Sequence, residues 1–167
     1  MAVILIGGGA RSGKSRYALE KARAIEGSCT FIATAEPSDD EMAARIRHHQ
    51  LERGAGFTTI EAPTDVARAI ADAPGGVILV DCLTIWLSNL MHARKDCDAE
   101  IDVLVDASKA ARGTIMFITN EVGSGIVPTD HALSREFRDR AGILNQRIAA
   151  IASEVYFVVF GQPLRVK

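Results

Sequence analysis

Short, nearly continuous apolar runs recur along the chain, and most of their residues are β-branched, aromatic or leucine. Such runs are typical of strands that are covered on both faces of a sheet, because a half-exposed strand alternates apolar and polar positions. The predicted strands are Val3–Ile6, Thr30–Ala33, Val77–Val80, Ile115–Thr119 and Val155–Phe160. A weaker run, Phe57–Ile60, is a candidate for a further strand, and Leu164–Lys167 for a short antiparallel edge strand.

Between these runs, apolar residues recur at steps of three and four, which predicts amphipathic helices. The clearest stripe holds Phe137, Ala141, Leu144, Ile148 and Ile151, and shorter stripes lie within 16–26, 66–70, 86–91 and 101–105. Alternating strands and helices favour an α/β fold with a mostly parallel sheet and helices on both faces. With 167 residues, 48% of them hydrophobic, we expect one domain over residues 1–167, without a linker or internal repeat.

A glycine-rich loop joins the first predicted strand to the first predicted helix. Its residues are Gly8, Gly9, Ala10, Arg11, Ser12, Gly13, Lys14 and Ser15. They fit the pattern G-x-x-x-x-G-K-[ST], in which backbone N–H groups and a helix N-terminus surround phosphate oxygens. Lys14 brings a cation to the outer phosphates, and Ser15 brings a hydroxyl to the usual Mg²⁺ position. The loop therefore predicts a nucleoside triphosphate site, but does not indicate which reaction uses it.

Polar residues also follow two other predicted strands. Asp81 comes directly after Val77–Val80, where P-loop proteins hold Mg²⁺, usually through water. Because ligands of open α/β sheets bind beyond the carboxyl ends of the strands, we expect Asp81 to complete a metal site with Ser15. The loop Thr119–Pro128 follows another strand, and its Asn and Glu residues are able to bind a hydroxyl or accept its proton. A connecting loop with turn glycines explains that spacing equally well.

The segment Ser38–Arg53 is a predicted helix with two adjacent histidines. Ser38 and Glu41 form a capping-box pattern at its start. One face of the helix holds Met42, Ile46 and His49. We therefore expect His49 to pack, whereas His48 lies about 200° around the helix from Ile46, on the polar face. Periodicity alone is compatible with a merely solvated His48.

Charge and cysteine content exclude several classes of protein. The net charge of −2 gives no basic field for nucleic acid or a membrane surface. The basic residues within 45–53 and 135–140 alternate with acids, as on solvated helix faces. Three irregularly spaced cysteines, Cys29, Cys82 and Cys97, indicate a reducing compartment and show no metal-ligand spacing. Since no apolar run reaches the length of a membrane span, we expect a cytoplasmic protein.

Six stretches, in order along the chain, together resemble one family. They are GGARSGKS (Gly8–Ser15), FIATAE (Phe31–Glu36), DDEMAARIRHHQLER (Asp39–Arg53), VDCLTIWLSNL (Val80–Leu90), TNEVGSGIVP (Thr119–Pro128) and FRDRAGILNQRIA (Phe137–Ala149). The chain resembles the bifunctional adenosylcobinamide kinase / adenosylcobinamide-phosphate guanylyltransferase family of cobalamin biosynthesis. The divergent parts, His92–Arg112 and the last few residues, touch none of these motifs.

The resemblance implies a P-loop NTPase fold of the RecA-like type and two reactions. The first transfers the γ-phosphoryl group of ATP or GTP to the aminopropanol hydroxyl of adenosylcobinamide. The second attaches GMP from GTP to that phosphate and releases pyrophosphate. In the family, the first histidine of the R-I-x-x-H-H segment becomes guanylylated, and that position is His48 here. A neutral imidazole near pH 7 is a competent nucleophile for this step.

The resemblance also implies a set of site residues. His48 and Lys14 are the expected catalytic residues, and Ser15 and Asp81 the expected ligands of Mg²⁺. Besides the phosphate loop, the expected nucleotide-binding residues are Ala33, Thr34, Ala35, His49, Gln50, Leu51, Glu52, Glu61 and Asp81, with Glu61 a candidate for the guanine or ribose. The base of the kinase step, Asp81 or Glu121, and the phosphoryl donor, ATP or GTP, stay open. The family further implies a homotrimer.

Two other functions are compatible with the phosphate loop. One is a simple small-molecule kinase in which His48 plays no part. The other is a RecA-like ATPase module, although the acidic balance and the lack of an aromatic–basic groove argue against binding of nucleic acid. We therefore expect GTP, ATP, adenosylcobinamide and adenosylcobinamide phosphate as ligands, with no nucleic acid and no membrane as partners.

Overall fold

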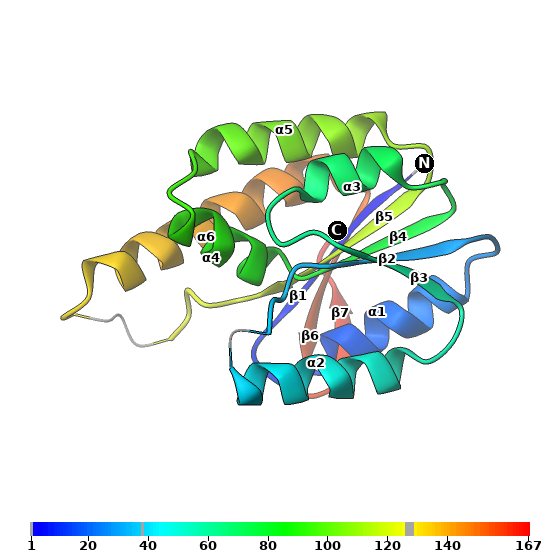
Figure 1. Ribbon diagram of the computed structural model, residues 1–167, viewed down its shortest axis with the longest axis horizontal. Helices are drawn as coiled ribbons and strands as arrows, with labels where there is room; N and C mark the ends of the chain where they lie inside the picture. Colours follow the sequence, from blue (N-terminus) through cyan, green and yellow to red (C-terminus); the bar gives the residue numbers. More distant parts are fainter. Residues whose placement is uncertain (1, 38, 126–128) are drawn as a thin grey trace.

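A computed structural model describes residues 2–37, 39–125 and 129–167, apart from the side chains at positions 45 and 52 (Figure 1). Seven strands form one sheet in the order β3-β2-β4-β5-β1-β6-β7. The strands are β1 (Val3–Gly8), β2 (Cys29–Ala33), β3 (Phe57–Glu61), β4 (Val77–Asp81), β5 (Thr114–Asn120), β6 (Glu154–Val159) and β7 (Gln162–Arg165). All neighbouring pairs are parallel except β6 and β7, which are antiparallel. The predicted mostly parallel sheet, its weak strand and its antiparallel edge strand are confirmed.

Helices cover both faces of this sheet. They are α1 (Lys14–Arg23), α2 (Asp40–Arg53), α3 (Val66–Asp72), α4 (Leu83–His92), α5 (Cys97–Ala110) and α6 (Ala132–Ile151). Figure 1 shows α1 and α2 on one face and α3, α4, α5 and α6 on the other. The sheet therefore has two cores, one beneath each layer of helices.

Strand β1 shows why the predicted strands read as continuous apolar runs. Its side chains alternate between the two cores, because successive residues of a strand point to opposite faces. Val3 and Leu5 belong to the cluster built with α3, α4, α5 and α6, whereas Ile4 and Ile6 belong to the cluster built with α1. All four side chains are buried. Both faces of the strand thus need apolar residues, and none of its positions between Val3 and Ile6 is polar.

Strand β7 begins two residues earlier than predicted. The predicted strand starts at Leu164, but the turn takes only Phe160 and Gly161, and Gln162 already pairs with Val159. Pro163 lies opposite Val158 within the strand. Proline is tolerated at this position because an edge strand has one side without ladder hydrogen bonds.

Helix α2 is attached to the sheet mainly through its last turn. Its N-cap is Asp39, whose carboxylate accepts a hydrogen bond from the N–H of Met42 at 2.7 Å; Ser38, the predicted cap, lies outside the described residues. Of the described side chains of α2, only Arg53 is buried. Its guanidinium lies 4.1 Å from the centroid of the Phe31 ring. The prediction that His49 packs is wrong: its side chain is exposed, because Arg53, one turn further on, makes the contact with the sheet.

A polar cluster joins α1 to β6. Lys21 Nζ lies 2.9 Å from Glu154 Oε2, and the Tyr156 hydroxyl donates to the same oxygen at 2.6 Å. These partners, Tyr156 first and Lys21 second, hold the pKa of Glu154 below its usual value. A carboxylate with a lowered pKa stabilises the folded state above its unfolded pKa of about 4.3, and this stabilisation is lost as the pH falls through the folded pKa.

Replacing Glu154 with glutamine is therefore expected to lower the free energy of unfolding by about 1 kcal/mol at pH 7. The neutral amide keeps the size of the side chain but loses the attraction to Lys21. Urea unfolding at pH 7 and at successively lower pH measures the difference, which should shrink as Glu154 becomes protonated in the parent protein. Equal stability of the two proteins at pH 7 would contradict this interpretation.

Candidate nucleotide site

The phosphate loop connects β1 to α1 at the carboxyl edge of the parallel strands. Gly8 and Gly13 are required there for different reasons. A Cβ atom on Gly8 would lie 2.5 Å from Ser12 Oγ and 2.7 Å from the Val158 carbonyl oxygen, so the loop could not close over a larger residue. Gly13 has a φ of 94°, in the left-handed region that favours glycine. The loop thus has the compact turn that its motif predicts.

Lys14 lies inside this loop. Its side chain is 8% exposed, and Nζ donates a hydrogen bond to the Gly9 carbonyl oxygen at 3.0 Å. Burial lowers the pKa of the Lys14 amine, while the charges of Cys82 and Asp81 act in the opposite direction. A buried cation held by one carbonyl is stabilised further by an anion, which is what a bound phosphate supplies.

Asp81, the last residue of β4, faces the loop. Burial raises the pKa of its carboxyl, whereas four neighbours lower it: in decreasing order His49, Lys14, the hydrogen bond of Ser15, and Arg53. Cations from α1 and α2 therefore converge on one carboxylate. The residue pair at the predicted metal position is thus brought together.

The donor atoms of Ser15 and Asp81 fit Mg²⁺. Both side chains offer oxygen, which this ion prefers, and Mg²⁺ is commonly held by one or two protein oxygens together with substrate phosphates. Among the described residues, no group of three or more His, Cys, Asp and Glu side chains could hold a metal without such help. Substrate phosphates and water would therefore complete the coordination.

The hydroxyl of Thr34 is hydrogen-bonded to the backbone of Cys82, the residue that follows Asp81. This hydroxyl donates to the Cys82 carbonyl oxygen at 2.9 Å and accepts from the Cys82 N–H at 2.8 Å. The Thr34 side chain is fully buried, and its carbonyl oxygen accepts a hydrogen bond from Asn89 at 2.8 Å. Thr34 thus fixes the backbone that follows Asp81. Both bonding functions of its hydroxyl are already used in this arrangement.

Replacing Thr34 with valine is expected to lower the free energy of unfolding by about 2 kcal/mol, because the isosteric side chain leaves the buried N–H of Cys82 without its partner. The Cys82 carbonyl oxygen keeps only the hydrogen bond from the Trp86 N–H, at 3.1 Å. Thr34→Ser keeps the hydroxyl and serves as the matched control, with a smaller expected loss. Urea unfolding of the three proteins measures the difference. If valine destabilised the protein no more than serine does, the hydrogen bonds to Cys82 would not contribute to stability as proposed.

The two histidines of α2 lie differently from one another. Both are exposed, with ring centroids 6.2 Å apart, but His49 is the one whose charge acts on Asp81. His48, one residue earlier, lies about 100° around the helix. The structure therefore brings His49 and Arg53 toward the phosphate loop.

Arg53 was not predicted as a site residue. Its charge acts on Asp81, and burial lowers the pKa of its guanidinium. The sequence does hold a signal, since Arg53 follows His49 by four residues and such residues share a helix face. Apolar periodicity alone does not find it.

The structure describes several of the remaining predicted nucleotide residues. Ala33 pairs with both Glu61 and Asp81 in the sheet, so the ends of β2, β3 and β4 are level. Glu61 is exposed, and so are Gln50 and Leu51; the side chain of Glu52 lies outside the description. The carboxyl ends of these three strands thus lie level at the edge of the sheet that carries Asp81.

Glu121 is engaged within its own loop. Its carboxylate accepts hydrogen bonds from the N–H of Gly123 at 2.6 Å and of Ser124 at 3.1 Å. Burial raises the pKa of Glu121, but the hydrogen bonds of Ser124 and Gly123 outweigh it, and the pKa is lowered. The Glu121 N–H also donates to the Gly8 carbonyl oxygen at 3.0 Å. The first part of the predicted Thr119–Pro128 loop therefore borders the phosphate loop, and residues 126–128 lie outside the description.

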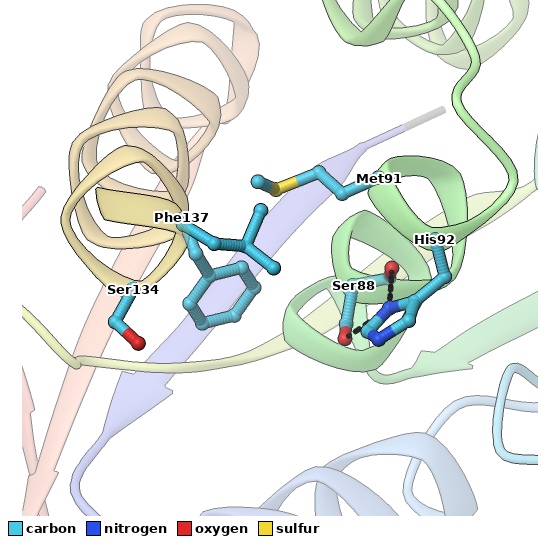
Figure 2. Close-up of a pocket in the computed structure, with 6 residues that line it drawn as sticks. Ser88, Met91, His92, Ser134 and Phe137 are labelled. Carbon is cyan, nitrogen blue, oxygen red and sulfur yellow. Dashed lines mark hydrogen bonds between the residues drawn. The ribbon is translucent and has the colours of Figure 1, made fainter. Parts of the chain in front are cut away.

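A shallow groove of about 180 Å³ lies between α4 and the start of α6 (Figure 2). Met91, Leu133 and Phe137 provide its apolar lining. His92 turns back on its own helix, with Nδ1 2.7 Å from the Ser88 carbonyl oxygen. The groove lies on the face of the sheet opposite to α1 and α2.

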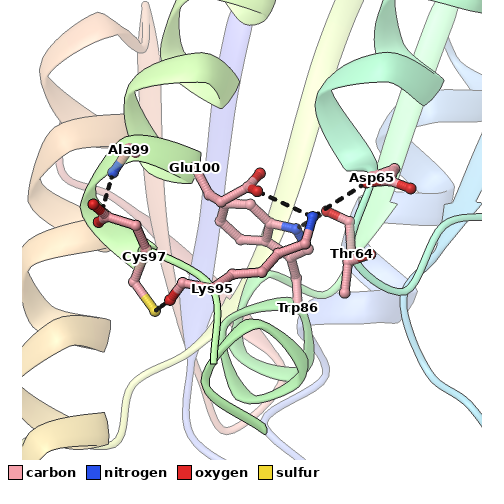
Figure 3. Close-up of polar contacts among 8 residues, drawn as sticks. Thr64, Asp65, Trp86, Lys95, Cys97, Ala99 and Glu100 are labelled. Carbon is pink, nitrogen blue, oxygen red and sulfur yellow. Dashed lines mark hydrogen bonds and ion pairs between the residues drawn. The ribbon is translucent and has the colours of Figure 1, made fainter. Parts of the chain in front are cut away.

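Trp86 belongs to the core, as its position on an apolar stripe predicted. Its side chain is 1% exposed, and Nε1 donates to the Thr64 carbonyl oxygen at 2.7 Å (Figure 3). In the same region Lys95 forms ion pairs with Glu100 and Asp65. Cys82 is also buried, and burial raises the pKa of its thiol to about 12, which disfavours the reactive thiolate.

The fold and the loop define a P-loop nucleotide-binding protein of the RecA-like type. The solved structure of an ATPase from the type III secretion system of pathogenic bacteria matches with a TM-score of 0.58. It is 10% identical, and the match covers 93% of this chain and 50% of that one. A likeness at this identity shows the fold alone. Among the described helices, none has both the length and the apolar character that crossing a membrane requires.

Sequence comparison identifies the family. Residues 4–166 match the family described as cobinamide kinase / cobinamide phosphate guanyltransferase. The bifunctional adenosylcobalamin biosynthesis protein CobU of Salmonella typhimurium is 41% identical over 185 residues, which cover 99% of each chain. The bifunctional protein CobP of Pseudomonas aeruginosa is 42% identical, over 98% of this chain and 96% of its own. The chain belongs to this family, as the resemblance of its motifs predicted.

Proposed function

We propose that the chain phosphorylates adenosylcobinamide and then transfers GMP from GTP to the product, giving adenosylcobinamide-GDP. The observation that carries this proposal is the position of α2, with its two histidines, beside a phosphate loop faced by Asp81. A simple kinase needs the loop and the carboxylate but no histidine at this place.

In the kinase step, the aminopropanol hydroxyl oxygen attacks the γ-phosphorus of ATP or GTP. The bond from that phosphorus to the bridging oxygen breaks, and the nucleoside diphosphate leaves. Lys14 and the loop N–H groups stabilise the charge that develops on the phosphate oxygens. The hydroxyl proton passes to a carboxylate, and Asp81 fits this role better than Glu121, whose oxygens accept bonds from Gly123 and Ser124.

In the transfer step, an imidazole nitrogen of His48 attacks the α-phosphorus of GTP. The bond to the α,β-bridging oxygen breaks, pyrophosphate leaves, and the imidazole proton is released to water. A phosphate oxygen of adenosylcobinamide phosphate then attacks the same phosphorus, and the N–P bond breaks. This regenerates His48, while Lys14 neutralises the departing pyrophosphate.

Ser15 and Asp81 would hold Mg²⁺, which when bound adds positive charge beside the phosphate oxygens. This assignment rests on the oxygen donors of the two side chains and on the hydrogen bond from Ser15 that lowers the pKa of Asp81. Lys14 supplies the other cation of the same region from within the loop.

Helix α2 must present His48 to an α-phosphorus, although His49 is the histidine whose charge acts on Asp81. We propose that α2 moves or turns when GTP binds, between Pro37 and Gly54. In support, Arg53 is the only buried side chain among those described in this helix. Structures with and without a GTP analogue would show the movement. An unmoved helix with His48 far from every phosphate would rule it out.

The remaining properties are proposed from the family. Residues 1–167 act as one domain of a cytoplasmic homotrimer, whose ligands are GTP, ATP and the two corrinoids, without nucleic acid or a membrane as partner. Light scattering on the purified protein measures the assembly. Filter binding with single-stranded DNA at low salt should show no retention.

The whole function is tested by following the products. The protein is incubated with adenosylcobinamide, ATP and GTP, and the corrinoids are analysed by mass spectrometry. We expect adenosylcobinamide phosphate first and adenosylcobinamide-GDP with pyrophosphate afterwards. A simple kinase would stop at the phosphate, and a nucleic-acid-dependent ATPase would form neither product.

A further inference from the structure

The turn between β6 and β7 exposes a large aromatic side chain. Phe160 is 95% exposed, with a φ of 52°, and the next residue, Gly161, has a φ of 78°. Positive φ at both positions of a two-residue hairpin is typical of a type I′ turn, which favours Asn-Gly or Gly-Gly. A phenylalanine there combines left-handed strain with exposure of its ring to water. Such costly positions concentrate at functional sites.

This turn is attached to the phosphate loop. The Gly161 N–H donates to the Ser12 carbonyl oxygen at 2.9 Å. A Cβ atom on Gly13 would lie 3.1 Å from Gly161 Cα, and one on Gly161 would lie 3.3 Å from the Arg16 guanidinium. Backbone contacts thus fix the place of Phe160 relative to the loop and to the first turn of α1.

The two sides of the phosphate loop carry different chemistry. Asp81 and the ends of β2 and β3 lie on one side of β1 in the sheet, and the β6–β7 hairpin lies on the other. A triphosphate whose γ-phosphorus lies near Asp81 and Ser15 has its outer phosphates on the first side. Its α-phosphate and nucleoside then point away, toward the first turn of α1 and the hairpin.

We propose that this hairpin is a nucleoside subsite, in which the ring of Phe160 stacks on the purine base of the nucleotide that donates its γ-phosphoryl group. Aromatic stacking suits any purine, because every base has a π-face. The Arg16 side chain beside Gly161 lies where it can approach the α-phosphate. This inference rests on the proposed kinase function and adds the site of the donor base.

The same placement separates the two reactions. Guanylyl transfer needs the α-phosphorus at His48, and its nucleoside then lies on the β3 side of the loop, near Glu61. Phosphoryl transfer needs the γ-phosphorus near Asp81, and its nucleoside lies at Phe160. One phosphate loop therefore holds a triphosphate in two orientations, with a base subsite on each side.

Binding of two ligands tests the proposal. Isothermal titration calorimetry compares a non-hydrolysable ATP analogue with inorganic tripolyphosphate, each with Mg²⁺. We expect Phe160→Ala to weaken binding of the ATP analogue about tenfold, toward the low end of what loss of a base–aromatic stack costs, and to leave tripolyphosphate binding unchanged. Phe160→Trp should restore binding. Leu164→Ala, which removes another exposed apolar side chain of the hairpin, should change neither.

A rate comparison adds a readout that a structural role would not give. In Phe160→Ala, kcat/KM for ATP in the kinase reaction should fall about tenfold from its value in the parent protein. The rate of His48 guanylylation by GTP should stay near its value in the parent protein. Equal losses in both, or equal losses for the analogue and tripolyphosphate, would overturn the proposal. The proposal would also be overturned if Phe160→Ala weakened binding only where light scattering shows a smaller mass than for the parent protein. A second copy of the chain would then cover Phe160.

Failure of the inference can be distinguished from failure of the proposed function. Lys14→Ala removes the cation from the loop and should abolish binding of both ligands. If the parent protein and Lys14→Ala bind tripolyphosphate equally, the phosphate loop does not act as proposed, whatever Phe160 does. If only Lys14→Ala loses binding and Phe160→Ala matches the parent protein, the proposed function stands and the subsite is wrong.

Discussion

Replacing Lys14 with alanine is expected to lower kcat/KM for the kinase reaction, and the rate of guanylyl transfer, by roughly two to three orders of magnitude each. The reason is that, in the proposed mechanism, one buried cation serves both reactions: it neutralises the transferring γ-phosphoryl group in the first and the departing pyrophosphate in the second. Its Nζ lies 3.0 Å from the Gly9 carbonyl oxygen, inside the loop. The other basic side chain of the loop, Arg11, is exposed, whereas Lys14 is buried.

Initial rates with γ-labelled ATP and with α-labelled GTP measure the two effects separately. Lys109→Ala, which removes an exposed lysine of α5, is the matched control and should behave like the parent protein. A large loss in only one of the two reactions would mean that they do not share the loop. Circular dichroism of Lys14→Ala verifies that the fold is kept.

Replacing His48 with alanine is expected to abolish both the covalent guanylyl group and the formation of adenosylcobinamide-GDP, while adenosylcobinamide is still phosphorylated. In the proposed transfer step the imidazole is the nucleophile, and alanine offers no replacement. In the proposed kinase step the phosphate loop and Asp81 act on the substrates, and the substitution leaves both in place.

His49→Ala is the control for this experiment, because it removes the neighbouring imidazole from the same helix. It should keep the label, although loss of its charge near Asp81 is expected to change the kinase rate. Protein incubated with α-labelled GTP is denatured and counted after acid and after base treatment. The label should be acid-labile and base-stable, as a phosphoramidate is. If His49→Ala lost the label and His48→Ala kept it, His49 and not His48 would be the nucleophile.

Much of the fold could be predicted because helices cover both faces of the sheet, so that its central strands are apolar at successive positions. The run Val77–Val80 is apolar throughout and is fully buried as the centre of β4. Strand β7 could be predicted only approximately, because its start depends on how few residues the turn uses. That number follows from the left-handed conformation of Phe160, which is uncommon for this residue type and leaves no signal in hydrophobicity.

The phosphate loop could be predicted because its motif is contiguous in the sequence, and Asp81 because it directly follows a predicted strand. Contacts between segments that are distant in the sequence could not be predicted. Helical periodicity gave His49 a packing role, yet the contact with the sheet is made by Arg53 over Phe31, a cation–π contact that no apolar stripe reveals. Thr34 was expected to line the nucleotide site, and the structure shows its hydroxyl bonded to the backbone of Cys82.

The central claim is that guanylyl transfer passes through His48 beside the phosphate loop, and a pulse–chase experiment tests it most directly. The protein is labelled with α-labelled GTP, separated from free nucleotide, and mixed with adenosylcobinamide phosphate in a rapid-quench apparatus. The account predicts that label leaves the protein and appears in adenosylcobinamide-GDP at a rate no slower than kcat. Label that stays on the protein while unlabelled GTP is converted to product at the full rate would contradict it.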